Sequence, residues 1–371
     1  MDKKVLMVAT VPSMIGQFNL NNIHLLLKMG YLVDVACDFN DTSVWPYERI
    51  QKFMKDMSEL GIECIQLDYS RNPLRLKRHI SSYKETLKLL KNKNYSFIHT
   101  HTPIASAIIR IAARRTKTKI IYTAHGFHFY NGAPIKNWII FYPIEKRLSK
   151  FTDVLITINQ EDYERAKKSF RAKQTVYIPG VGVDIVKFKP RNEERQKIRK
   201  ELNISDDKIM ILSVGELNNN KNHESVIKAL KGLNLTYVIV GKGELKEKLE
   251  NLAKECSVDL RLMGYRTDVA DFYNAADVYI LPSIREGLNV SLMEAMASGL
   301  AVACGNIRGN KDLIKDNDVL FNPLNISDIN NSIKFAIKNR IILGNKNFEN
   351  IKKYSIDKVN YSMTELYKKI N

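Results

Sequence analysis

Short apolar runs alternate with amphipathic stretches along this 371-residue chain, and this alternation limits the possible folds most. The runs have the length of strands, and helical periodicity separates most of them. Because parallel strands need a crossover connection, the pattern predicts parallel sheets covered by helices. Two series of runs predict an α/β protein with two Rossmann-like domains. The expected strands are Val5–Val11, Leu32–Cys37, Ile62–Leu67, Phe97–His101, Lys119–Ala124, Asp153–Ile158 and Thr175–Pro179, then Ile209–Val214, Thr236–Val240, Asp259–Met263, Val278–Leu281 and Ala301–Cys304.

A cluster of proline and glycine separates the two series. Ile178–Asp184 holds Pro179, Gly180 and Gly182, and a charged helical stretch follows Pro190. Such clusters interrupt regular structure. We therefore predict a first domain over residues 1–184 and a second over residues 185–353. Further helices are expected over Asn19–Met29, Leu74–Lys91, Glu224–Leu230, Leu245–Cys256, Asn289–Ser298 and Tyr354–Ile370.

Positive charge is concentrated in the first half of the chain. The net charge is +18, and residues 69–120 hold 13 Lys and Arg residues against one acid, Glu85. Such a segment attracts nucleic acid or the anionic cytoplasmic leaflet of a membrane. Asn137–Leu148 mixes aromatic and basic residues, which is typical both of an interfacial helix and of a core helix with a basic edge. A generally lysine-rich composition remains an alternative explanation of the charge.

Cysteine usage and hydropathy predict the compartment. The four cysteines show no metal-type spacing, which favours buried thiols in a reducing environment. No apolar run reaches the eighteen residues of a membrane span, and the first apolar run is too short for an export segment. We expect a cytoplasmic protein that associates peripherally with the inner face of the cell membrane.

Two glutamates, Glu286 and Glu294, are separated by seven residues. An expected strand precedes the first, and an expected helix, which Gly299 is suited to end, carries the second. One carboxylate then lies at a strand end and the other about two turns later. The N–H groups of a helix N-terminus between them attract phosphate, and sugar hydroxyls can donate to both carboxylates. Two solvated helix-start glutamates are the alternative.

The run from Pro282 to Gly299 resembles the E-x7-E signature of glycosyltransferase family 4, whose members are retaining enzymes of GT-B architecture. The Pro-Gly cluster before Pro190 resembles the segment that joins the two domains in this family. The resemblance covers essentially the whole chain. It implies two Rossmann-like domains that face each other across a cleft. The first would bind the acceptor and be completed by the C-terminal helix 354–371, and the second would bind a nucleotide sugar.

The resemblance also implies donor-binding residues in the second domain. Lys221 would stabilise the departing diphosphate, Glu286 would hold donor-sugar hydroxyls, and Glu294 would accept from the ribose. Glu216 stands where the family usually has an arginine, and the cation that replaces it stays open among Arg285, Arg308 and Lys242. The expected donor-binding set is Gly215, Lys221, Gly241, Gly264, Tyr265, Glu286, Gly287, Leu288, Asn289 and Glu294.

In the first domain, the Thr-Ala-His-Gly run places His125 where the family has a histidine near the donor sugar. His125, Glu286 and Lys221 are the expected catalytic residues. Gly16 and His128 are expected on the acceptor side, with Gly16 in a strand–helix turn. His99 and His101 resemble half of a metal site, but no further ligand pattern accompanies them, so both are predicted to be structural. His101 is also a weaker candidate for contact with the acceptor.

The resemblance finally implies a reaction. We expect metal-independent, retaining transfer of a hexose or N-acetylhexosamine from a UDP-sugar to a lipid-diphosphate-linked saccharide, in assembly of a bacterial capsule, exopolysaccharide or O-antigen. No cofactor is expected, and the partners are the two substrates and an anionic membrane surface, without nucleic acid. A nucleotide-sugar epimerase of GT-B-like fold is one alternative. A basic nucleic-acid-binding protein is another, although no motif supports it.

Overall fold

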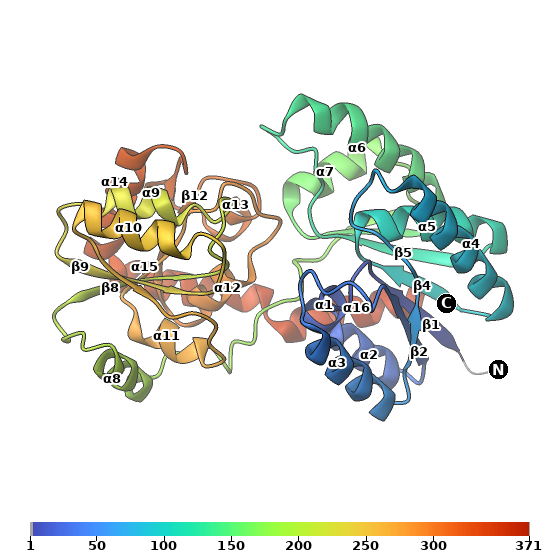
Figure 1. Cartoon of the computed structure of the whole chain (residues 1–371), viewed down its shortest axis with the longest axis horizontal. Coiled ribbons are helices and arrows are strands. Elements are labelled where there is room, and N and C mark those ends of the chain that lie inside the picture. The colour runs from blue at the N-terminus through green and yellow to red at the C-terminus, as the bar shows by residue number, and fades with distance from the viewer. Residues whose placement is uncertain (1–2, 371) are drawn as a thin grey trace. The chain divides into compact units, whose positions relative to one another are not determined.

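The computed structural model describes residues 3–370, apart from the side chain of Asn192. The chain divides into two compact units (Figure 1). Unit 1 comprises Met1–Val181 together with Val359–Asn371, and unit 2 comprises Gly182–Lys358. The chain therefore passes from one unit to the other twice.

Unit 1 contains a seven-stranded sheet in the order β3-β2-β1-β4-β5-β6-β7, and all its strand pairs are parallel. The strand order reverses beside β1, which pairs with both β2 and β4. In parallel sheets, ligands bind at the carboxyl ends of strands near such a reversal. The strands are β1 (Lys4–Val8), β2 (Leu32–Cys37), β3 (Glu63–Gln66), β4 (Phe97–Thr100), β5 (Lys119–Ala124), β6 (Val154–Thr157) and β7 (Gln174–Tyr177).

Helices cover both faces of this sheet. One buried apolar cluster joins the sheet to α1, α2, α3 and α16, and a second joins it to α4, α5, α6 and α7. In α16, Tyr367 is fully buried and stacks on Phe97 of β4 at 5.6 Å between ring centroids. The helices are α1 (Pro12–Phe18), α2 (Leu20–Lys28), α3 (Tyr47–Glu59), α4 (Leu76–Asn92), α5 (Pro103–Thr116), α6 (Ile135–Leu148), α7 (Gln160–Ser169) and α16 (Ile356–Ile370).

Unit 2 contains a six-stranded parallel sheet in the order β10-β9-β8-β11-β12-β13. The strands are β8 (Ile209–Val214), β9 (Leu235–Val240), β10 (Asp259–Leu262), β11 (Val278–Leu281), β12 (Ala301–Gly305) and β13 (Leu320–Phe321). The helices are α8 (Asn192–Glu201), α9 (His223–Ala229), α10 (Lys246–Cys256), α11 (Val269–Ala275), α12 (Val290–Ala297), α13 (Asn310–Leu313), α14 (Ile326–Lys338) and α15 (Arg340–Ile351).

The prediction of two parallel α/β sheets is confirmed, and the expected strands lie within about three residues of the observed ones. Strand β13 was not predicted, because two residues are too short to show a period. The expected helix after Glu286 is α12, and Gly299, with φ of +71°, follows its last turn as predicted. Within residues 3–370, no helix combines the length and the hydrophobicity that a membrane crossing requires.

Candidate functional site

Most of the predicted donor-binding residues lie in loops that follow strands of unit 2. The loops after β8, β9, β10 and β11 carry them, and these strands are neighbours in the parallel sheet. The carboxyl ends of parallel strands share one edge of a sheet. The structure therefore places these loops along one edge of unit 2.

Three glycines join the first three of these loops. A Cβ at Gly241 would lie 1.8 Å from the carbonyl oxygen of Gly215, far inside van der Waals contact. The N–H of Gly215 donates to the carbonyl of Val240 at 3.0 Å, and Gly241 and Gly264 form an antiparallel bridge. The predicted glycines at 215, 241 and 264 are thus brought together, and Gly241 permits an approach that no other residue allows. Tyr265, which follows Gly264, is 62% exposed.

Lys221 and Glu286 form an ion pair. Nζ of Lys221 lies 2.7 Å from Oε1 of Glu286, and both side chains are largely buried. The loops that carry them are tied by two hydrogen bonds of Asn220, whose carbonyl accepts from the Ile284 N–H at 2.9 Å and whose side chain donates to the Arg285 carbonyl at 3.0 Å. The structure therefore brings together two of the three predicted catalytic residues.

Arg308 contacts the backbone of the same loop. Its Nε donates to the carbonyl of Glu286 at 3.1 Å, and its side chain is 9% exposed. The next residue, Gly309, would place a Cβ 2.0 Å from the carbonyl oxygen of Gly287, so β12 is followed by a loop pressed against the Glu286 segment. Among Arg285, Arg308 and Lys242, Arg308 is the one whose side chain is bonded to that segment.

Glu216 is exposed and does not enter this arrangement. Its Oε2 accepts a hydrogen bond at 2.9 Å from the side chain of Asn218 in the same loop. Asn218 in turn accepts from the Lys221 N–H at 3.0 Å. Glu216 thus contributes to the loop that positions Lys221, without supplying a second cation.

Glu294 is partly buried on α12. The hydroxyl of Tyr273 donates to its Oε2 at 2.9 Å. Burial raises the pKa of Glu294 to about 7, although the hydrogen bond from Tyr273 and the positive charge of Lys187 act in the opposite direction. Both protonation states of this carboxyl are therefore populated at neutral pH.

The N-terminus of α12 is capped by Asn289. Its Oδ1 accepts from the N–H of Leu292 at 3.1 Å and from the hydroxyl of Ser291 at 2.6 Å. Gly287 and Leu288 precede this cap, so their N–H groups lie ahead of the first helical turn, as the sequence predicts. Phosphate binding by these groups stays a prediction.

Unit 1 places a row of three histidines at the ends of β4 and β5. Nε2 of His125 lies 3.3 Å from Nδ1 of His101, and the ring of His101 lies 4.2 Å from the ring of His99. Burial lowers the pKa of His125 to about 4 and that of His99 to about 3, and the pKa of His101 is also well below its ordinary value. All three rings are therefore neutral at pH 7.

His99 and the central histidine, His101, differ in their partners. His99 bonds to the Tyr367 hydroxyl and to the Thr123 hydroxyl, both at 2.8 Å, so both its ring nitrogens are satisfied. His101 uses only Nδ1, and its buried Nε2 has no hydrogen-bond partner among the described residues. The contact of His101 with His125 was missed, because it depends on the pairing of β4 with β5. No group of three or more metal-type ligands occurs in the described part of the chain.

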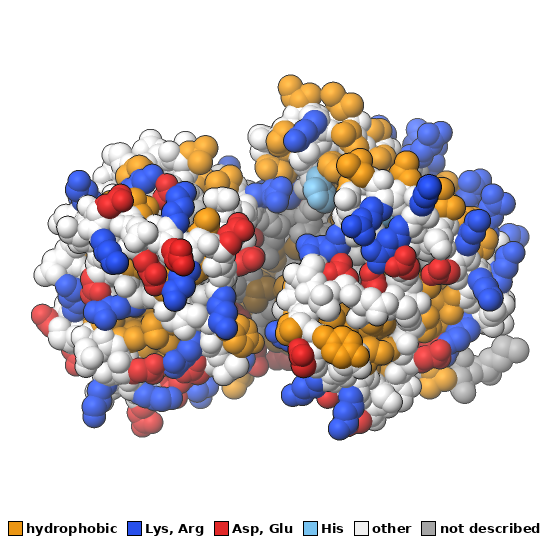
Figure 2. Space-filling model, in the orientation of Figure 1, with side chains coloured by type: hydrophobic (Ala, Val, Ile, Leu, Met, Phe, Trp, Pro, Cys, Tyr) orange, Lys and Arg blue, Asp and Glu red, His pale blue; other side chains and the backbone are white. Residues whose placement is uncertain are grey.

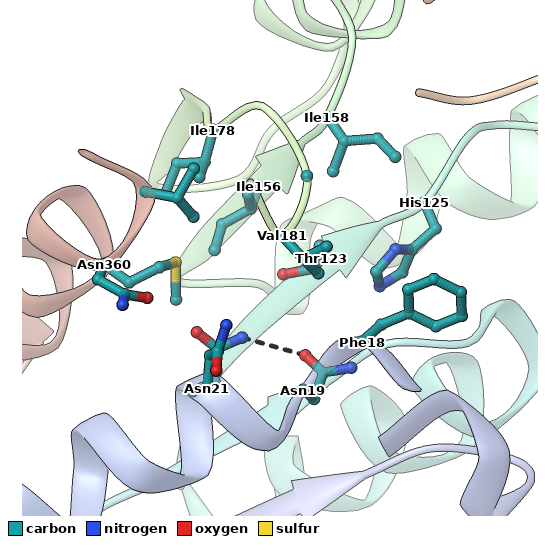
Figure 3. A pocket seen from close by; sticks show the side chains of 14 residues that line it. Phe18, Asn19, Asn21, Thr123, His125, Ile156, Ile158, Ile178, Val181 and Asn360 are labelled. Carbon is teal, nitrogen blue, oxygen red and sulfur yellow. Dashed lines mark hydrogen bonds between the residues drawn. The ribbon is translucent and has the colours of Figure 1, made fainter. Parts of the chain in front are cut away.

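His125 lines a small cavity of about 20 Å³ in unit 1 (Figure 3). Phe18 lies beside it at 6.3 Å between ring centroids, and Asn19 and Asn22, joined by a 3.0 Å hydrogen bond, line the same space. A cavity of this size holds about one water molecule, so these side chains do not enclose a sugar within it. These asparagines were not predicted as site residues, although Asn19, Asn21 and Asn22 crowd the segment after the first strand.

The two predicted acceptor-side residues have different surroundings. Gly16 lies inside α1 and not in a turn, so that expectation was wrong. A Cβ on Gly16 would lie 2.3 Å from the Trp45 ring, which explains the small residue by packing. His128 is exposed, its ring lies 4.7 Å from that of Phe141, and it lines two larger cavities of unit 1. Acceptor binding by either residue stays a prediction.

Two parallel α/β units of this kind define the GT-B architecture, and the chain belongs to the glycosyltransferases. Residues 17–185 match Glycosyltransferase Family 4, and residues 194–357 match Glycosyl transferases group 1.

Relatives and solved structures agree with this assignment. A "putative glycosyltransferase EpsD" of Bacillus subtilis (strain 168) is 34% identical over 330 residues, which are 86% of this chain and 82% of that protein. An Escherichia coli "UDP-Gal:alpha-D-GlcNAc-diphosphoundecaprenol alpha-1,3-galactosyltransferase" is 31% identical over 255 residues, or 66% of each chain. Anabaena HepE, solved with UDP and glucose, superposes with a TM-score of 0.78 at 17% identity, over 99% of this chain and all of that one, and shows the fold alone.

Proposed function

We propose that this glycosyltransferase is a retaining enzyme that moves a hexose or N-acetylhexosamine from a UDP-sugar to a lipid-diphosphate-linked saccharide in assembly of a bacterial surface polysaccharide. The observation that carries the proposal is the Lys221–Glu286 pair at the loop edge of unit 2, with Glu294 in the second turn of α12. The names of two relatives support the acceptor class. The Escherichia coli galactosyltransferase and a Campylobacter jejuni "N,N'-diacetylbacillosaminyl-diphospho-undecaprenol alpha-1,3-N-acetylgalactosaminyltransferase", which is 24% identical, are both named for a sugar-diphosphoundecaprenol. The UDP-Gal in the name of the Escherichia coli relative supports the donor class.

In this proposal the ion pair exchanges partners when the donor binds. The diphosphate takes the ammonium of Lys221, and the carboxylate of Glu286 is released to accept hydrogen bonds from sugar hydroxyls. Arg308, bonded to the Glu286 carbonyl, supplies the second positive charge that Glu216 cannot supply. Glu294 accepts from ribose hydroxyls, a role that its ionised form performs best.

The chemistry follows from these charges. The bond between the anomeric carbon and the diphosphate oxygen breaks, and the acceptor hydroxyl bonds to that carbon on the same face. The hydroxyl proton passes to the departing phosphate oxygen. Lys221 and Arg308 stabilise the negative charge that develops on the diphosphate, so we expect the reaction to need neither a divalent metal nor a cofactor. His125, which is neutral, forms a hydrogen bond with a sugar hydroxyl.

Unit 1 also carries a surface suited to a membrane. Ile135 and Ile139 on α6 are 76% and 69% exposed, and Leu76 on α4 is 67% exposed. Figure 2 shows hydrophobic side chains over α6 and many Lys and Arg side chains over α4 and α5. Exposed apolar side chains beside cations favour an anionic bilayer. We propose that unit 1 rests on the inner face of the cell membrane, which flotation with anionic and neutral vesicles tests.

The first experiment is titration calorimetry of the protein with UDP and a panel of UDP-sugars, with and without EDTA. We expect UDP binding that survives EDTA and weakens in Glu294→Ala, and the sugar bound most tightly identifies the donor. Absence of nucleotide binding under all conditions would contradict the proposal. Conversion of a UDP-sugar without any acceptor would instead indicate an epimerase.

A further inference from the structure

Two adjoining cavities in unit 1 lie outside the histidine row. The larger, here called the polar cavity because Thr10, Ser13, Gln17 and Arg71 line it beside a larger number of apolar residues, has a volume of about 460 Å³. The smaller, here called the apolar cavity, has a volume of about 250 Å³ and includes Ala107, Ile108, Phe127 and Phe129. They share a common wall of lining residues: Pro73, Pro103, Ile104, His128 and Phe141. The two cavities are thus neighbouring parts of one hollow surface.

The apolar cavity offers no unpaired charge to a ligand. Its carboxylate, Glu145, is paired with the buried Arg110 at 2.9 Å. The guanidinium of Arg110 also lies over the ring of Tyr122 at 4.4 Å, and burial raises the pKa of the Tyr122 hydroxyl well above its ordinary value. An ionic or strongly polar ligand would lose its hydration here without compensation. A hydrocarbon chain would gain free energy by leaving water.

The segments that line the apolar cavity also carry large apolar side chains that are exposed. Ile144 lines it and is 48% exposed, and Ile140, one turn earlier on α6, is 50% exposed. Leu74 and Ile80 directly adjoin the lining residues Pro73 and His79 and are 84% and 58% exposed. Several large exposed apolar residues on the segments that line one cavity are typical of a surface that faces an apolar partner or a lipid phase.

The polar cavity contains a cation and shares one lining residue with the small cavity at His125. Arg71 lines it, and the basic segment 69–120 continues from there along α4. Phe18 lines both the polar cavity and the small cavity that contains His125. Along unit 1 the lining therefore changes from the amides beside His125, through a cavity that includes Arg71, to an apolar cavity.

We infer that the apolar cavity binds the first part of the hydrocarbon chain of a lipid-diphosphate acceptor, with the diphosphate in the polar cavity beside Arg71. This inference rests on the proposed function, because the acceptor class comes from there. The order of the three linings corresponds to the order of saccharide, diphosphate and hydrocarbon in such a molecule. The enzyme then recognises the lipid itself and not only the membrane that contains it.

Calorimetry with two probes tests the inference: geranylgeranyl diphosphate, kept below its critical micelle concentration, and inorganic pyrophosphate. We expect the prenyl diphosphate to bind about tenfold more tightly or better, because burial of each methylene contributes to affinity. Equal affinities would overturn the inference. So would equally tight binding of a fatty acid of the same length, which would indicate a general acyl site.

Two matched variants of α5 locate the effect. Ala107→Phe places a ring in the apolar cavity and should abolish the preference for the prenyl chain. Ile111→Phe, one turn further along α5 at a 43% exposed position outside both linings, should leave the preference unchanged. A preference that persists in Ala107→Phe overturns the inference, provided that circular dichroism shows a folded variant.

UDP binding, measured in the same preparations, separates the two proposals. If UDP binds and the prenyl preference is absent, only the lipid site is wrong. If the prenyl preference depends on Ala107 and UDP does not bind, the lipid site stands and the donor class must be revised.

Discussion

The two units form their candidate sites with opposite chemistry. In unit 2, glycines bring three loops together and an ion pair between Lys221 and Glu286 lies at their edge. In unit 1, three histidines are held neutral by burial, and the neighbouring cavities are lined largely by aromatic, amide and aliphatic side chains. The difference indicates that the loop edge of unit 2 suits a charged ligand, whereas the histidine row and the apolar cavity of unit 1 suit an uncharged sugar and a hydrocarbon chain.

Removal of the Lys221 ammonium should have the largest effect on activity. In Lys221→Ala the departing diphosphate loses its main positive partner, and we expect kcat/KM to fall by roughly 10²-fold to 10³-fold. Lys246→Ala, at a 63% exposed side chain on α10, is the control and should retain full activity. Steady-state kinetics with the preferred UDP-sugar measures both. A loss of less than about threefold for Lys221→Ala would show that unit 2 does not depend on this charge.

One added methyl group should separate the loops of Gly215 and Gly241 in unit 2. Gly241→Ala would place a Cβ against the Gly215 carbonyl and should lower the free energy of unfolding of unit 2 by about 2 kcal/mol or more. Gly232→Ala is the control, since Gly232 has φ of +81° but no atom near its Cβ position. That variant should cost only about 1 kcal/mol of backbone strain. Differential scanning calorimetry compares the two, and equal losses would show that the loops can move apart freely.

Glu294 should contribute a smaller, pH-dependent effect. Glu294→Gln keeps a hydrogen-bond acceptor for Tyr273 but no longer carries a charge, so we expect UDP to bind about tenfold more weakly at pH 8. At pH 6 the wild-type carboxyl, whose pKa is raised to about 7, is mostly protonated, and the difference between the two proteins should shrink. A difference that is the same at both pH values would mean that the charge of Glu294 does not contact the nucleotide.

Mild acid should affect unit 1 through its histidines. Their pKa values are lowered in the folded state, so below pH 6.5 the unfolded state binds protons that the folded state does not, and stability falls as the pH drops toward 4. Both tryptophans of the chain, Trp45 and Trp138, lie in unit 1, so their fluorescence reports the unfolding of this unit. We expect the fluorescence-detected Tm to decrease between pH 7 and pH 5 by a few degrees.

Replacement of the central histidine is the control for this effect. His101→Asn removes one titrating group, and its Tm should depend less on pH in the same range. An identical pH dependence in wild type and variant would mean that His101 does not contribute to the acid sensitivity of unit 1.

Local patterns in the sequence predicted the scaffold well. The apolar run Ile209–Val214 ends at a glycine and Val278–Leu281 ends at a proline, so their bounds were predicted correctly. The prediction of a turn at Gly16 was wrong, since this residue lies inside α1. The overlooked signal is Pro12, because proline is favoured at the first position of a helix. The reason for a glycine at position 16 is the ring of Trp45, which no local pattern reveals.

Contacts between distant residues could not be predicted. The pair Lys221–Glu286 spans 65 residues, and the contact between His101 and His125 requires the register of β4 against β5. The family resemblance indicated which residue types belong in the donor loops, but not that the two charges would pair. The two larger cavities of unit 1 could not be predicted from the sequence either, because α1, α4, α5 and α6 each contribute only a few residues to their linings.

The hydrogen bond between Tyr367 and His99 spans 268 residues, because α16 follows the whole of unit 2 in the chain. During synthesis, the ribosome completes unit 2 before it releases the helix that fills the core of unit 1. Unit 2 can therefore fold on the ribosome before unit 1 is complete. Until α16 is synthesised, one hydrophobic face of unit 1 is uncovered and His99 lacks its hydrogen bond to Tyr367. A nascent chain that stops before α16 would contain a folded unit 2 joined to an incomplete unit 1. The folding of unit 1 therefore depends on the last fifteen helical residues of the chain.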